Sequence, residues 1–169
     1  VASAFRNVRV RIRFPVVSPT VTSCSTNNFS IRPTGFTVSS ADATNTGTSG
    51  TPRFKAGSEN FNLTAASVAG YNGTPLIDNT AGMVVGTPNQ GTISGAFGAA
   101  SPVTGTATGS SFSYSEVGNF GLGANAVFDS SFTSVDAPGV DCTVGFSNIL
   151  VGGQYGCSIG STAVAQTTG

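Results

Sequence analysis

The chain contains no histidine, and it carries few charged residues of any kind. Without an imidazole, neither a Ser-His-Asp nor a Cys-His catalytic arrangement can form. The glycine motifs that bind phosphates or dinucleotides are missing as well, and so is every zinc pattern. Glu59, Glu116 and five aspartates remain as acids, but no spacing marks two of them as a hydrolytic pair. The sequence therefore predicts a protein that is not an enzyme and uses no metal or cofactor.

Charged residues make up 8% of the chain, against about a quarter in typical domains. So few charges leave little repulsion between copies of the chain, which suits secreted proteins and assembling filaments. No run of 18 or more apolar residues is present, so we expect no membrane-spanning segment. No initiator methionine or signal segment opens the chain, and we expect a piece cut from a longer exported precursor.

The few charges are segregated along the chain. All seven lysines and arginines lie within the first 55 residues, and six of the seven acids follow them. Two interpretations stay open. Folding intermixes the two sets, or the chain is a two-ended dipole that favours head-to-tail contact.

What the chain does contain points to β structure. Hydrophobic residues make up 38%, twelve of them Phe, which is enough for a core, and β-branched residues outnumber helix formers. About ten short alternating segments, with turn signals every 8 to 12 residues or so, predict one antiparallel β-sandwich domain over residues 1–169. Residues 41–52 have loop composition, and residues 119–128 (NFGLGANAVF) are expected to form one strand.

The clearest strand signal is residues 7–14, NVRVRIRF. Strict alternation predicts one buried face and one face of three arginines toward solvent or a partner. The segment is also a candidate for completing a neighbour's sheet by strand addition. A nucleic-acid role is not favoured, because no aromatic platform accompanies the arginines. The apolar face comprises Val8, Val10, Ile12 and Phe14.

Two of the three cysteines are predicted to form a disulfide. Between Cys142 and Cys157 lies TVGFSNILVGGQYG, which has the pattern of a strand, a Gly-Gly turn and a second strand, so the loop ends can meet. In an exported chain this pairing contributes roughly 3 kcal/mol by the loop-closure estimate. Cys24 is left over. Its alternatives are a partner upstream in the precursor, a link to another molecule, or a small buried thiol.

The stretch CSTNNFSIRP is predicted to be a structural motif. Its polar residues would form a turn that directs Phe29 and Ile31 into the core. Arg32, held extended by Pro33, would hydrogen-bond carbonyls or pair with an acid such as Glu116. A ligand pocket around Arg32 is the alternative.

Residues 24–36 (CSTNNFSIRPTGF) resemble a motif of MshQ-like proteins of Gram-negative bacteria, which are associated with the mannose-sensitive haemagglutinin type IV pilus. Residues 61–75 (FNLTAASVAGYNGTP), residues 112–122 (FSYSEVGNFGL) and the hairpin ending in Tyr155-Gly156-Cys157 are similar to further blocks of that family, in the same order. The Gly-Arg-Phe motif that begins the family's following region is missing from residues 161–169. The resemblance implies an exported domain with Ig-like or adhesin-like β structure and no assigned catalysis, and it transfers no functional residue.

These observations predict a non-enzymatic, extracellular structural or adhesive module of a pilus-associated bacterial surface appendage. Its expected partners are other copies, appendage proteins or surface glycans. The first alternative is a self-assembling fibre subunit joined by β-strand complementation. The second is a carbohydrate-binding sandwich, which would need exposed aromatic platforms, yet the chain has no Trp and three Tyr.

Overall fold

The computed structural model describes residues 2–40 and 59–168, and within them every regular element is a β-strand. The prediction of an all-β chain with antiparallel sheets is confirmed. The predicted loop at residues 41–52, together with Arg53 and Lys55, lies outside the described residues. The strands are β1 (Phe5–Val8), β2 (Arg11–Phe14), β3 (Val21–Cys24), β4 (Phe29–Ile31), β5 (Thr37–Ser39), β6 (Phe61–Ala66), β7 (Leu76–Ile77), β8 (Val84–Pro88), β9 (Ile93–Ser94), β10 (Thr106–Tyr114), β11 (Gly118–Leu122), β12 (Val127–Asp129), β13 (Ile159–Gly160) and β14 (Val164–Thr168).

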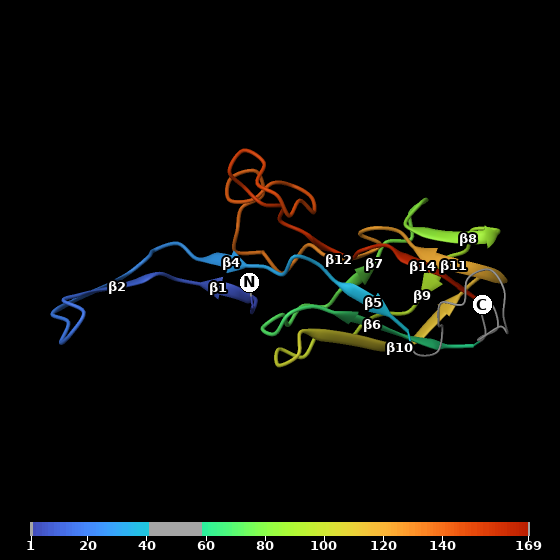
Figure 1. The fold of residues 1–169 in the computed structure, drawn as a ribbon, viewed down its shortest axis with the longest axis horizontal. Coiled ribbons are helices and arrows are strands. Elements are labelled where there is room, and N and C mark those ends of the chain that lie inside the picture. The colour runs from blue at the N-terminus through green and yellow to red at the C-terminus, as the bar shows by residue number, and fades with distance from the viewer. Residues whose placement is uncertain (1, 41–58, 169) are drawn as a thin grey trace.

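The strands form several small antiparallel sheets. A four-stranded sheet has the order β5-β6-β10-β9, and two three-stranded sheets have the orders β14-β11-β8 and β13-β12-β7. Together they curve around the core as a half-barrel. Two two-stranded sheets, β1-β4 and β2-β3, lead away from this body toward the left of Figure 1.

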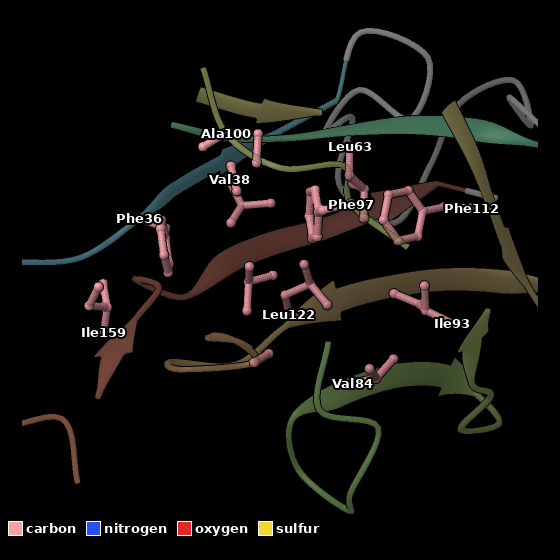
Figure 2. Close-up of a cluster of buried hydrophobic side chains, with 14 of the residues drawn as sticks. Phe36, Val38, Leu63, Val84, Ile93, Phe97, Ala100, Phe112, Leu122 and Ile159 are labelled. Carbon is pink, nitrogen blue, oxygen red and sulfur yellow. The ribbon is translucent and has the colours of Figure 1, made fainter. Parts of the chain in front are cut away.

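The core lies between the four-stranded sheet and β11 and β8, as Figure 2 shows. Alternation along β6 buries every second residue, and β10 pairs with it over most of its length. The aromatic rings form a continuous series: Phe97 packs on Phe112, which packs on Phe61, and Phe120 contacts both Phe61 and Tyr114. Large buried rings of this kind dominate core energetics, so this series holds the sheets together.

The N-terminal alternation does not build a core strand. Residues 7–14 contribute to two strands, and the second, β2, pairs only with β3 in a hairpin that projects from the body (Figure 1). Val10, Ile12 and Phe14 are 51%, 66% and 71% exposed, and Val8 is half-buried. The prediction that this face is buried is therefore wrong. Alternation sets which side chains share a face, but no second layer covers this one.

The expected single strand at residues 119–128 is divided in two. β11 ends at Leu122, and β12 begins at Val127 in a different sheet. Between them the chain turns at Asn125, whose φ is +66°. Ala124 is consequently exposed, whereas Phe120 and Ala126 are buried as the alternation predicts.

No helix in the part of the chain that the structure describes is long and apolar enough to cross a membrane.

Replacing Phe112 by Ala tests the position of the core. Phe112 is fully buried against Phe61 and Phe97, so its truncation should lower the free energy of unfolding by about 3–5 kcal/mol. Phe14→Ala is the matched control, because the same truncation at an exposed ring should change it by less than about 0.5 kcal/mol. Urea denaturation in dilute solution measures both, and equal effects would contradict the assignment.

Candidate functional site

The acidic residues do not assemble a catalytic or metal centre in the described ranges 2–40 and 59–168. No group of three or more Cys, Asp or Glu there could hold a metal ion. A shallow hollow on the outer face of β5, β6 and β10 is lined by small polar residues such as Ser39, Thr64 and Thr108, without a titratable group. The features that stand out are instead two surfaces rich in exposed apolar side chains.

The first surface is a projecting hairpin that we call the arm, residues 9–28. In its register Ile12 faces Ser23 and Phe14 faces Val21. Directly opposed residues of an antiparallel pair lie on one face, so Ile12, Phe14 and Val21 share a face. Arg11 and Arg13 lie on the other. The arm is therefore amphipathic, with an apolar face and a cationic face that are both open to solvent.

Hydrogen bonds close the base of the arm. The Val10 amide donates to the Ser25 hydroxyl at 3.1 Å, and the Ser25 amide donates to the Val10 carbonyl at 2.8 Å. The Ser25 hydroxyl donates in turn to the Asn27 carbonyl, and the Arg9 guanidinium donates to the Asn28 side chain. Polar residues of CSTNNFSIRP thus form a turn of the expected kind, in which side chains satisfy nearby backbone.

The body anchors the strands from which the arm extends. The Ala4 amide donates to the Ala69 carbonyl at 2.7 Å, and the Ser30 amide donates to the Asp136 carboxylate. The Arg6 guanidinium donates to the Ser131 carbonyl and lies 4.9 Å from the centre of the Phe132 ring. Such a cation–π contact adds to the attachment. The arm therefore projects from a fixed base.

The second surface is a compact lobe, residues 136–157, that we call the disulfide lobe. The structure contains the predicted Cys142–Cys157 disulfide, with a Cα–Cα distance of 5.2 Å. The expected Gly-Gly turn is also present, since Val151 and Gln154 exchange backbone hydrogen bonds around Gly152 and Gly153. The lobe stands out above β4 in Figure 1. Its exposed apolar side chains are Val140, Val144, Ile149, Leu150, Val151 and Tyr155.

Arg32 and its neighbours attach this lobe to the body. The Arg32 guanidinium donates to the Ser147 carbonyl at 2.6 Å and to the Pro33 carbonyl at 2.9 Å. In the opposite direction, the side-chain amide of Asn148 (Nδ2) donates to the Thr34 carbonyl at 2.7 Å. Burial lowers the pKa of Arg32 from its ordinary value. Carbonyl contacts of this kind are those expected of Arg32, and Glu116 is not among its hydrogen-bond partners.

One expectation and one alternative for the same motif are wrong. Phe29 is 40% exposed and Ile31 is half-buried, and neither belongs to the core cluster. Both lie on β4, which pairs with β1 beside the base of the arm instead of inside the body. Cys24 is a free, exposed thiol on β3, so it is not a small buried thiol. Its proposed partner upstream or in another molecule stays a prediction.

No sequence pattern indicated that the carboxylate of Asp129 is buried, as the structure shows it to be. The Tyr71 hydroxyl donates to Asp129 Oδ2 at 2.7 Å, and Asp129 Oδ1 accepts bonds from the Ser131 amide and hydroxyl and the Phe132 amide. A Cβ added at Gly73 would lie 2.1 Å from the same carboxylate. Tyr71 and Asp129 are 58 residues apart in sequence, so no local pattern could pair them.

Two of the sequence blocks that carry the resemblance, residues 61–75 and 112–122, have structural roles here. In the first, Tyr71 is buried and Gly73 leaves room for the Asp129 carboxylate. In the second, the Tyr114 ring stacks on Phe120 at 4.7 Å. Gly118 has φ +120°, and a Cβ there would lie 2.1 Å from the Thr87 carbonyl oxygen. These residues determine packing and backbone conformation, and none of them belongs to the arm or to the disulfide lobe.

Comparison with protein-family models, with curated proteins and with solved structures finds no match for this chain.

Arg32→Ala tests the attachment of the disulfide lobe. Removing the guanidinium leaves the Ser147 carbonyl without its charged donor and should lower the free energy of unfolding by about 1–2 kcal/mol. Arg11→Ala, at an exposed position of the arm, should change it by less than about 0.5 kcal/mol. Thermal and urea denaturation of both variants measure the difference. A loss at position 11 as large as that at position 32 would refute the assignment.

Tyr71→Phe tests the buried hydrogen bond through its pH dependence. Burial, followed by the bond to the Asp129 carboxylate, raises the pKa of Tyr71 well above its ordinary value of 10.0. An unfolded chain therefore loses this proton at lower pH than the folded one. The stabilisation is complete below about pH 10 and declines above it, by up to about 1.4 kcal/mol per pH unit.

At pH 8, Tyr71→Phe should cost about 1–3 kcal/mol, since Asp129 Oδ2 loses its donor. Above pH 10 the variant should lose stability less steeply than the wild type. Denaturation curves between pH 8 and 11 measure both slopes, and parallel slopes would show that Tyr71 does not carry the effect.

Proposed function

We propose that this chain is a non-enzymatic, extracellular structural or adhesive module of a bacterial cell-surface appendage, and that the arm is its principal contact surface. The observation that carries the proposal is the exposed apolar face of the arm. A two-stranded hairpin is marginally stable alone in water, and it gains stability when another layer covers its apolar face. Covering Ile12 and Phe14 would contribute about 1.5–3 kcal/mol for each fully buried side chain.

The character of the chain supports a location outside the cytoplasm. The Cys142–Cys157 disulfide is of a kind that persists in oxidising compartments. The low content of charge suits a protein that packs against others in a permanent assembly. The resemblance to MshQ-like proteins leads to the same proposal, with an Ig-like or adhesin-like sandwich as the finer description of the fold. Sheets facing each other across the aromatic core are compatible with that description.

A self-assembling fibre subunit is the second candidate, and one observation favours it. Within the described residues, β2 and β3 pair only with each other, so each has an edge free of strand pairing. Exposed edges of this kind are templates for strand addition by another chain. In this reading the arm donates or accepts a strand, and residues 10–14 form the contact.

The carbohydrate-binding alternative has less support. Sugar-binding surfaces use exposed aromatic rings, and Tyr71 and Tyr114 are both fully buried. Tyr155 is exposed, but it lies on the disulfide lobe among aliphatic side chains.

The proposal predicts that a charge on the apolar face of the arm prevents incorporation into the surface appendage. Val21→Asp places a carboxylate beside Phe14, where a covering partner would have to desolvate it. Detached appendages from producing cells should then contain at least tenfold less of this variant than of the wild type, as measured by quantitative immunoblotting against total cell content.

Val103→Asp provides the matched control. Val103 is 80% exposed in a turn of the body, between two residues that are likewise exposed. This variant should be incorporated like the wild type. Equal incorporation of all three proteins, or absence of the wild-type chain from the appendage fraction, would refute the proposed function.

A further inference from the structure

We infer that the occupant of the arm's apolar face is the disulfide lobe of a second copy of this chain. This inference rests on the proposed function and names the partner of the arm. The contact is heterologous, since an arm meets a lobe and the two surfaces differ. Repeated from copy to copy, such a contact builds an open chain unless its rotation closes.

Charge complementarity selects this partner surface. The arm, residues 9–28, contains Arg9, Arg11 and Arg13 and no acid. Residues 136–157 contain Asp136 and Asp141 and neither Lys nor Arg. Asp141 is exposed, and the Asp136 carboxylate is half-buried. Opposite charges on the arm and on the lobe favour the encounter of the two surfaces.

Both surfaces also offer apolar area that nothing in the same copy covers. On the lobe, Ile149 and Leu150 are 73% and 58% exposed. Their segment is held in place, because the disulfide closes the loop and the side chain of Asn148, adjacent to Ile149, donates to the Thr34 carbonyl. A preordered surface loses little conformational entropy on binding. Ile149 and Leu150 are therefore suited to cover the apolar face of the arm, on whose opposite face Arg11 and Arg13 lie.

The same reasoning disfavours the other contacts between copies. Two arms pairing edge to edge would bring six arginines together without an acid, and like charges in one interface repel. Two lobes would bring acids together in the same way. Within one copy, the arm extends away from the body, and its tip lies far from the lobe in Figure 1. The arm of one copy and the lobe of another are the complementary pair.

Mixing two variants tests the inference directly. Ile12→Ser with Phe14→Ser removes apolar side chains from the arm without adding charge, and Ile149→Ser with Leu150→Ser does the same for the lobe. Sedimentation velocity of the full chain at 1–500 μM gives the association state. The wild type should self-associate, and each double variant alone should do so at least tenfold more weakly.

In an equimolar mixture, the intact arm of the lobe variant can bind the intact lobe of the arm variant. The mixture should therefore form a one-to-one complex with about the wild-type affinity for a single contact. Val103→Ser is the control and should associate like the wild type. The wild-type association should also weaken as NaCl is raised from 50 to 500 mM, because the Arg–Asp attraction is screened.

Three results would overturn the inference. In the first, the wild type stays monomeric at 500 μM. In the second, the lobe variant self-associates like the wild type while the arm variant does not, which is the outcome of arm-to-arm pairing. In the third, both variants are monomeric and their mixture is too. Matching melting temperatures for all four proteins would establish that altered folding is not the cause.

Failure of this inference is distinguishable from failure of the proposed function. If the mixing test fails while Val21→Asp still abolishes incorporation into appendages, the arm binds a different appendage protein and the proposed function stands. If Val21→Asp is incorporated normally, the proposed function is wrong, whatever the association state of the purified chains.

Discussion

The pairing of β10 with β6 is the interaction on which the rest of the body depends. It brings Phe61 and Phe112 together from segments more than forty residues apart, and Phe112 lies opposite Phe61 in the register. Phe97, Phe120 and Tyr114 then extend the series of contacting rings. Residues of β8, β11, β12 and β13 join this core, whereas none of its members comes from the arm or the disulfide lobe. The side chains of the arm and the lobe can therefore stay uncovered without opening the core.

Local sequence patterns predicted two kinds of element correctly. The first kind pairs with a segment close in sequence, and the second has an apolar face that a second layer covers. The alternation along β6 and along the last residues of β10, Phe112 to Tyr114, matches the burial there, because both strands lie in a sheet with a packed inner face. The Cys142–Cys157 hairpin was predictable because its turn and its two cysteines lie within one short segment. All-β architecture followed from composition for the same reason: strand propensity is a local property.

Contacts between residues far apart in the chain could not be predicted from the sequence. The alternation in NVRVRIRF is as regular as that of a core strand, but a period of two residues contains no information about whether a second layer exists. Tyr71 and Asp129 meet across 58 residues, and Arg32 reaches Ser147 across 115. For Arg32 the kind of contact, to carbonyls, was foreseeable from its extended backbone, whereas the particular carbonyl was not. The exposure of Ile149 and Leu150 was not predicted, because an apolar Ile-Leu-Val run is expected to be buried.

The way in which the arm is rooted also determines how it responds to mechanical force. β1 runs from the body toward the arm, β4 runs back from the arm to the body, and the two strands are paired side by side. Tension on the tip of the arm is thus shared by the two strands along their length, and does not peel one from the other. The resistance falls on the junction with the body, where Ala4 bonds to Ala69 and Ser30 bonds to Asp136. A pull on the arm would therefore be divided between two strands, each with its own attachment to the body.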